Sequence, residues 1–442
     1  MTPPSFDTPA GRLLGWRDGR VIRATGIRYA RAGRFQAPVA EPPSSTDIDA
    51  TEWSPACAQA DHPFGMGLMQ SSVRQLATTE DCLRLSLTLP EDVTPGDRRP
   101  VMVWIHGGSY VFGAGDAAIY DPKALVEEQG VIVVSVTYRL GLLGFLGGAE
   151  GRAANLGLLD IIAALRWVKT NIAAFGGDPD CVTLFGQSAG GDAIAHLMIA
   201  EGAQDLFRRA IIQSAPLGIS LGRRKMTEAM MKIAARVAHD ATTEDVIAAQ
   251  DSVVSAASGF GWPASMPFGT QYGHHPLPEE RDIDAAWSRC APRFDVLIGL
   301  TAEEGSFFIP IIDAAKKMAA LPMIGGVLRR AIVDTITRKV YAAAAQRFAK
   351  RHVQGGGRAF TYLIHWGSKT NQLGATHAID LPLLFGDEQT WRDADLIAGL
   401  DWTEVHSRGR KVREVWSSFA RTGTLEPGLI EPEVLSYKSV HD

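Results

Sequence analysis

The sequence has few cysteines, a small net charge and no long uninterrupted apolar run. Four cysteines among 442 residues are too few for a disulfide scaffold in a chain of this length. The formal net charge of -5 provides no basic domain of the kind that nucleic-acid binding requires. No uncharged apolar stretch is long enough to span a bilayer. We therefore expect no nucleic-acid partner and no membrane insertion.

The first fifteen residues also lack the pattern of a secretory leader. Residues 1–15 contain no basic segment followed by an apolar run. This absence predicts a cytoplasmic protein.

Short apolar runs alternate with helical patterns along the chain. Residues 155–175 and 189–200 carry apolar side chains at helical spacing. The β-branched runs lie at 101–106, 131–138, 182–185, 209–213, 295–300 and 360–365. This alternation predicts an α/β fold with a mostly parallel central sheet and helices on both of its faces.

The segments outside this pattern differ in composition. The N-terminal hundred residues are rich in Gly, Pro and Arg and predict small antiparallel strands and loops that lead into the sheet. Residues 216–290 and 306–355 read as helical insertions that form a cap over the active site, within one domain spanning 1–442. The second insertion is basic, and we interpret its charges as the solvated face of amphipathic helices, with a surface-binding role as the alternative. Its bases are Lys316, Lys317, Arg329, Arg330, Arg338, Lys339, Arg347, Lys350 and Arg351.

A Gly-x-Ser-x-Gly string places Ser188 between an apolar strand and a helix. Gly186 and Gly190 flank the serine at two residues on either side. This is the setting of a nucleophile elbow, in which small residues let neighbouring backbones approach a tight turn. A serine hydroxyl needs a base to take its proton, and in this arrangement an acid and then a histidine follow in the chain.

The acid and the histidine are expected after later core strands. Glu303 and Glu304 both follow the strand at 295–300, and spacing alone admits either. The glycine after Glu304 suits a sharp turn and favours that residue. His377 lies in the loop after the strand at 360–365, whereas its competitor His365 lies within or at the end of the strand, where a packed or pocket-wall role is expected.

A glycine turn after the first long core strand provides backbone donors. His106-Gly107-Gly108-Ser109 matches the HGGG-type loop of esterases and lipases, with serine in the last place. The N–H groups of Gly108, Ser109 and Ala189 are predicted to form an oxyanion hole.

These motifs together resemble the type-B carboxylesterases, the cholinesterase-like family of the α/β hydrolases. The resemblance runs from about residue 11 to 423 and includes Glu80-Asp81-Cys82-Leu83, residues 155–160, Phe175-Gly176-Gly177-Asp178-Pro179, Glu304-Gly305 and residues 377–382. It implies the α/β-hydrolase fold, a Ser188–His377–Glu304 triad and a three-donor oxyanion hole.

The resemblance also implies structural roles. Cys57 and Cys82 look like the pair that forms a disulfide in secreted relatives, and in a reducing cytosol they stay thiols. Arg34 with Glu80, and Arg139 with Asp160, resemble internal ion pairs of the family, and Ser214 resembles a serine beside the catalytic acid. Two positions depart from the family pattern: Gln187 stands where many relatives have Glu, and Asp380 replaces the usual Glu after the histidine.

The resulting hypothesis is a carboxylic ester hydrolase that works through an acyl-enzyme and needs no metal or organic cofactor. A neutral Gln187 beside the nucleophile favours a neutral small-molecule ester with a small or medium acyl or aryl group. Aromatic candidates for the pocket wall are Tyr110, Phe112, Trp262, Phe307 and Phe308, although core packing is the commoner role of such residues. The alternatives are a non-catalytic cholinesterase-like binding module and the same chemistry on amide, carbamate or thioester bonds.

Overall fold

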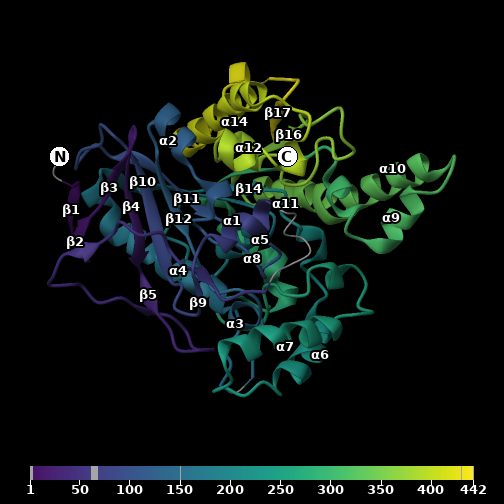
Figure 1. The fold of residues 1–442 in the computed structure, drawn as a ribbon, viewed down its shortest axis with the longest axis horizontal. Helices are drawn as coiled ribbons and strands as arrows, with labels where there is room; N and C mark the ends of the chain where they lie inside the picture. Colours follow the sequence, from purple (N-terminus) through teal and green to yellow (C-terminus); the bar gives the residue numbers. More distant parts are fainter. Residues whose placement is uncertain (1–2, 61–67, 150, 430, 442) are drawn as a thin grey trace.

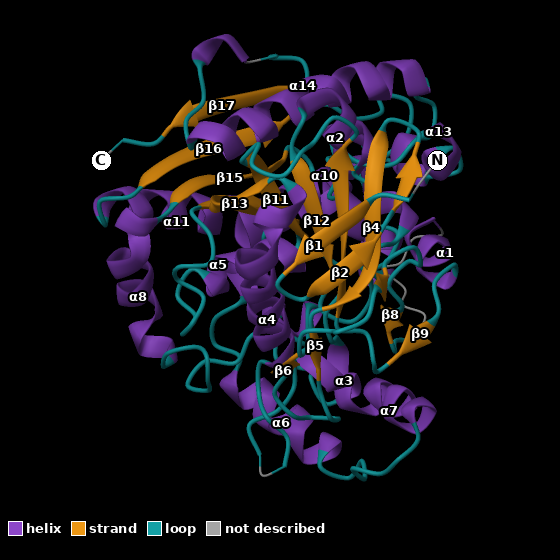
Figure 2. Cartoon of the chain, turned by 90° about the vertical axis from the view of Figure 1, so that its left-hand side faces the viewer, coloured by secondary structure: helices purple, strands orange, loops and turns teal. Residues whose placement is uncertain are grey.

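The architecture is a ten-stranded sheet with helices on both faces. A computed structural model describes residues 3–60, 68–149, 151–429 and 431–441. The strand order is β17-β16-β15-β14-β13-β11-β12-β10-β4-β3. Figure 2 shows α2 (Lys123–Gln129) and α14 (Trp402–Thr422) on one side of the sheet, and α4 (Leu156–Asn171), α5 (Ala189–Leu197) and α8 (Ile283–Cys290) on the other. The predicted α/β-hydrolase fold is confirmed.

Six neighbouring strands are parallel, and each overlaps one of the apolar runs predicted to form a strand. Because both faces of these strands are covered, their side chains are almost all buried. They are β11 (Arg99–Ile105), β12 (Ile132–Val136), β13 (Gly177–Gln187), β14 (Arg209–Gln213), β15 (Asp295–Thr301) and β16 (Arg358–Ile364).

The register aligns the carboxyl ends of these strands. Ile105 of β11 pairs with Gly186 of β13, Gln187 pairs with Gln213 of β14, and Thr301 pairs with Ile364. The segments that leave these ends therefore meet at one edge of the sheet, which is where ligands bind in open α/β sheets.

The N-terminal segment contributes more to the main sheet than its composition predicts. β3 (Trp16–Asp18), β4 (Val21–Arg28) and β10 (Arg84–Pro90) extend the sheet beyond β12 in antiparallel pairs, and β17 (Leu435–Ser439) closes the other edge. Smaller sheets are formed by β1 (Ser5–Thr8), β2 (Gly11–Leu14) and β7 (Ile48–Asp49), by β5 (Ala30–Arg31) and β6 (Val39–Ala40), and by β8 (Ala56–Cys57) and β9 (Thr78–Thr79).

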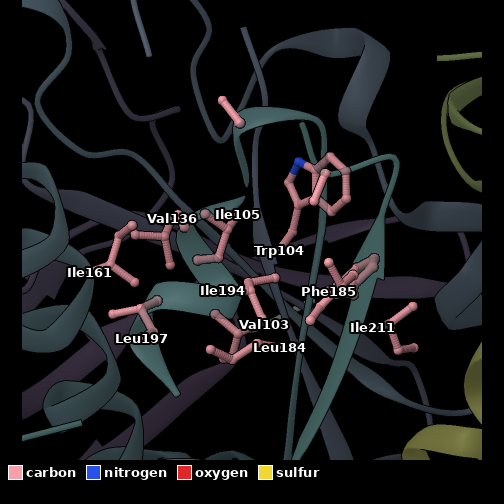
Figure 3. Close-up of a cluster of buried hydrophobic side chains, with 14 of the residues drawn as sticks. Val103, Trp104, Ile105, Val136, Ile161, Leu184, Phe185, Ile194, Leu197 and Ile211 are labelled. Carbon is pink, nitrogen blue, oxygen red and sulfur yellow. The ribbon is translucent and has the colours of Figure 1, made fainter. Parts of the chain in front are cut away.

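The main core lies between the central strands and the helices beneath them. Figure 3 shows Val103 of β11 and Leu184 of β13 packed with Ile161 of α4 and Ile194 of α5. Each of these side chains is fully buried, so burial of apolar surface is the main force holding α4 and α5 against the sheet.

Both insertions contain helices. The first contains α6 (Arg224–Ala234), α7 (Thr243–Ser255) and α8. The second contains α9 (Asp313–Ala319), α10 (Gly325–Ile336), a π-helical segment Thr337–Ala342 and α11 (Ala343–Gln354). The remaining helices are α1 (Leu68–Arg74), α3 (Gly141–Gly144), α12 (Leu381–Leu384) and α13 (Glu388–Trp391).

Candidate active site

Ser188 lies in the turn between β13 and α5, in a strained backbone conformation. Its φ of 57° and ψ of -123° are unusual for a residue with a side chain. A Cβ at Gly186 would be 2.5 Å from the carbonyl oxygen of Ile105, and one at Gly190 would be 2.0 Å from the same atom. Both glycines are therefore required because the end of β11 passes directly against this turn.

The glycine loop after β11 lies against the serine. A Cβ at Gly107 would be 2.6 Å from the carbonyl oxygen of Gln187 and 3.2 Å from the Cβ of Ser188. Gly108 and Ser109 both have positive φ, at 108° and 54°. This conformation leaves their N–H groups free to face a ligand.

The three predicted oxyanion-hole donors are free. Within the described part of the chain, no acceptor takes a hydrogen bond from the N–H of Gly108, Ser109 or Ala189. Ala189 opens α5, where the first N–H groups of a helix have no intrahelical partner. The loop is supported by buried His106, which bonds through Nδ1 to the Gly107 carbonyl at 2.8 Å; burial lowers the pKa of His106 to about 4, so it is neutral.

His377 and Glu304 form a buried pair at the same edge of the sheet. His377 Nδ1 contacts Glu304 Oε2, and the Glu304 side chain is completely buried. The other carboxylate oxygen, Oε1, accepts hydrogen bonds from Ser214 Oγ at 2.6 Å and from the Thr301 N–H at 2.8 Å. These donors fix the carboxylate and compensate for its burial.

The two competing residues lie elsewhere. Glu303 accepts a hydrogen bond from the Ala375 N–H at 3.2 Å and lies 3.8 Å from Arg330, so it faces away from His377. His365 is exposed and bonds to Ser436 Oγ at 2.8 Å. The expectation that His365 is packed or lines a pocket is wrong, because its side chain points outward beside the edge strand β17.

Gln187 and Asp380 flank the histidine. Gln187 Nε2 lies 3.2 Å from His377 Nε2, which places a neutral amide donor on the ring nitrogen opposite Glu304. Asp380 is fully buried, and its Oδ2 accepts a hydrogen bond from Gln213 Nε2 at 2.6 Å. Burial raises the pKa of Asp380 to about 6, and the nearby Glu304 carboxylate adds to the effect.

A cavity of about 280 Å³ opens between Ser188, His377 and the glycine loop. Gly108, Ser109 and Gln187 line it, and its remaining wall is mostly apolar. The apolar wall consists of Val111, Phe112, Pro216, Ile219, Val254, Trp262, Ala264, Met266, Pro267, Phe307, Phe308, Ile312, Ile336, Val340, Tyr341 and Ala378.

Four of the five aromatic candidates line this cavity. They are Phe112, Trp262, Phe307 and Phe308. Tyr110 does not, because its ring is fully buried behind the loop and its hydroxyl donates to Asp192 at 2.7 Å.

Tyr341 is an aromatic residue of the wall that was not among the sequence candidates. Its ring centroid lies 5.2 Å from that of His377. Tyr341 lies in the π-helical segment Thr337–Ala342, and such segments are often found at functional sites. Helical periodicity places this residue only approximately, because a π-turn adds a residue to the repeat.

The proposed structural contacts are present. Arg34 pairs with Glu80, with Nε 2.9 Å from Oε2, and Arg139 pairs with the fully buried Asp160 at 2.7 Å. Cys57 and Cys82 are free thiols and completely buried, and contact with Cys57 together with burial raises the pKa of Cys82.

The described residues form neither a metal-binding cluster nor a membrane-spanning helix. Across residues 3–60, 68–149, 151–429 and 431–441, no three His, Cys, Asp or Glu side chains are arranged to hold a metal ion. Among the helices of that same part of the chain, none is long and apolar enough to cross a membrane.

The chain is similar to several known proteins. A family model described as "Carboxylesterase family" matches residues 2–321. A probable N-octanoylanthranilate hydrolase, AqdA2 of Rhodococcus erythropolis, is 37% identical over 94% of this chain and 92% of its own length. The para-nitrobenzyl esterase of Bacillus subtilis (strain 168) is 34% identical over 96% and 91%. The solved structure of a thermophilic PNB esterase superposes with a TM-score of 0.81 at 29% identity, covering 100% of this chain and 94% of that one.

Proposed function

Because this chain belongs to the carboxylesterase family and is a serine carboxylesterase, we propose that Ser188, His377 and Glu304 are its catalytic triad. The observation that carries the proposal is the contact of His377 Nδ1 with the buried Glu304 carboxylate, beside a cavity that Ser188 also lines. With Nδ1 held by Glu304, the other nitrogen, Nε2, acts as the base when the proton of Ser188 replaces the Gln187 amide that lies 3.2 Å from it.

The chemistry is two-step acyl transfer. Ser188 Oγ attacks the ester carbonyl carbon while His377 Nε2 takes its proton. The C–O bond to the alcohol then breaks, and His377 returns the proton to the leaving oxygen. Water, deprotonated by the same nitrogen, attacks the acyl-enzyme and releases the acid and Ser188. Glu304 holds the imidazole in one orientation and stabilises its charged form.

The N–H groups of Gly108, Ser109 and Ala189 are proposed to bind the oxyanion. Their support is that no described acceptor uses them and that two of the three residues line the cavity. Donors already oriented toward the developing charge need no reorganisation during the reaction, and each is typically worth about 10²–10³ in kcat.

The substrate is proposed to be a neutral ester with an apolar acyl or aryl group. The cavity wall is dominated by aliphatic and aromatic side chains, and none of its lining residues is a carboxylate. Gln187 places a neutral amide next to the nucleophile, so nothing at this position attracts a cationic alcohol.

A second candidate is the same chemistry on an acyl group carried by nitrogen. The Rhodococcus relative is named for an N-octanoyl substrate, and it matches nearly the whole chain. An octanoyl chain would suit a wall built from residues such as Ile219, Met266 and Val340. Comparing rates on matched octanoyl ester and octanoyl anilide substrates decides between the two bonds. The other alternative, a non-catalytic binding module, needs no triad, and the described geometry does not favour it.

Both insertions take part in the site, which supports the proposal of one catalytic domain over 1–442 with a cap. Ile219, Val254 and Met266 come from 216–290, and Phe307 and Tyr341 come from 306–355. The cap and the sheet therefore enclose one cavity together.

The test uses a matched pair of histidine variants. His377→Ala and Ser188→Ala are each expected to lower kcat on a nitrophenyl butyrate ester by several orders of magnitude. His365→Ala, the control at the competing histidine, should retain near-normal activity. A fluorophosphonate probe should label the native protein on the peptide that contains Ser188. Full activity of Ser188→Ala, or labelling at another serine, would refute the assignment.

A further inference from the structure

The helices α9 and α10 form a hairpin that projects from the body of the molecule, at the right of Figure 1. Their facing sides are held by a small apolar cluster of Ile309, Ala315 and Val333, which is separate from the main core. The hairpin is thus anchored at its base, while its tip is surrounded by solvent.

The tip of this hairpin is apolar and exposed. Met323 is completely exposed and Val327 is 72% exposed. The full set, here called the hairpin tip, is Met318, Leu321, Met323, Ile324 and Val327. None of these side chains belongs to either apolar cluster of the described residues. A contiguous group of large exposed apolar side chains marks a contact surface more often than isolated ones do.

Positive charge flanks the hairpin tip on both helices. Residues 312–340 contain six bases and two acids, a net charge of +4 in a chain whose net charge is -5. Lys316 and Lys317 lie directly before Met318 of the tip, are exposed and make no ion pair with any described residue. Arg330 follows the tip and is engaged by Glu303 and Asp334.

The base of the hairpin reaches the cavity. Ile312, immediately before α9, and Ile336, at the end of α10, both line it. Val254 and Trp262 of the first insertion also line it and are partly exposed apolar side chains. An apolar path thus connects the hairpin with the substrate cavity.

We propose that the hairpin tip docks on an anionic lipid surface, with its apolar side chains entering the headgroup layer and Lys316 and Lys317 at the level of the lipid phosphates. Apolar residues flanked by bases are the combination that binds such surfaces, because burial and charge attraction add. The tip of a second copy of this chain is a poorer occupant, since two tips of net positive charge repel each other. Docking on lipid does not depend on the proposed function. Delivery of lipid-held esters to the cavity rests on the proposed esterase function.

The experiment is cosedimentation of the full chain with vesicles of phosphatidylcholine containing phosphatidylglycerol, and with vesicles of phosphatidylcholine alone. The native protein should bind the anionic vesicles, and binding should weaken as salt is raised. Lys316→Gln/Lys317→Gln should reduce the binding constant by about fivefold for each lysine removed. Met323→Ser/Val327→Ser should reduce it further still.

Matched controls separate this effect from a general change of surface. Lys225→Gln/Lys438→Gln removes the same charge from exposed positions elsewhere, and Val39→Ser removes a side chain that is 70% exposed, like Val327. Both controls should bind as the native protein does. Hydrolysis of a soluble nitrophenyl acetate should be unchanged in all variants, and vesicle binding is measured whether or not that activity exists.

Two results would overturn the proposal. One is equal binding to neutral and anionic vesicles, or none to either. The other is a dimer, seen by analytical ultracentrifugation, that dissociates in Met323→Ser/Val327→Ser, because the hairpin tip would then be a protein interface.

Discussion

Replacing Asp380 with asparagine tests how burial controls ionisation beneath the candidate triad. Burial raises the pKa of this carboxyl from 3.8 to about 6. One of its oxygens accepts from Gln213, and the other has no hydrogen-bond partner among the described residues. The folded protein therefore holds the proton of Asp380 more tightly than the unfolded chain does.

The direction in which stability changes with pH follows from this difference in proton affinity between the folded and the unfolded chain. The contribution of Asp380 to the free energy of unfolding is most favourable below pH 3.8 and is lost as the pH rises from 3.8 to about 6. A difference of about two pKa units corresponds to roughly 3 kcal/mol, at about 1.4 kcal/mol per unit. About two-thirds of this change falls between pH 4.5 and pH 8. Asparagine carries no charge at any pH and keeps an oxygen that accepts from Gln213, so Asp380→Asn abolishes the loss.

The assay is thermal unfolding of both proteins at pH 4.5 and at pH 8. A chain of this length has an unfolding entropy near 0.9 kcal/mol per degree, so about 2 kcal/mol moves Tm by roughly 2 °C. The quantity compared is the Tm of Asp380→Asn minus the Tm of the native protein. We expect this difference to be about 2 °C larger at pH 8 than at pH 4.5. Asp393→Asn, at an exposed position, is the control and should show no such difference. An identical Tm offset at both pH values for Asp380→Asn would refute the reasoning.

Three further predictions concern the triad and its support. Glu304→Gln should lower kcat on a nitrophenyl ester by about 10³–10⁴ with little change in KM, because the amide favours the wrong histidine tautomer; a loss below tenfold would contradict the triad. Gly190→Ala should prevent recovery of folded protein, since its Cβ would lie 2.0 Å from the Ile105 carbonyl oxygen; an unchanged circular-dichroism melt would disprove this. Arg139→Met leaves the Asp160 carboxylate buried and unpaired, so it should cost about 3–5 kcal/mol; a Tm unchanged at pH 7 would count against that reading.

Sequence order predicts the central strands and the nucleophile turn well, because both depend on local features. The apolar run before Ser188 and the glycines around it dictate a strand, a turn and a helix over a dozen residues. The register then aligns the ends of the parallel strands, which brings distant segments such as Gly107 and Glu304 to one edge. For these residues, the order of elements along the chain is enough to predict that they lie at the same edge of the sheet.

Other positions depend on contacts that the sequence does not encode locally. Glu303 and Glu304 differ by only one residue in their spacing from the strand, and only the turn after the strand decides which carboxylate faces His377. Tyr110 is an aromatic residue next to the glycine loop, yet its ring points into the core and bonds to Asp192. In a strongly bent loop, tertiary packing decides to which side a side chain points, and spacing in the sequence does not.

The π-helical segment Thr337–Ala342 bears on how this cavity changes over evolutionary time. A π-turn contains one residue more than the α-helix that would replace it. Deleting a single residue there would rotate α10 and the first part of the segment by on the order of 100° relative to α11. Such a deletion would swing the Tyr341 side of the wall away from His377 while leaving the strands of the sheet in place. In this fold, a one-residue insertion or deletion is therefore a shorter route to a new substrate range than several substitutions along the wall.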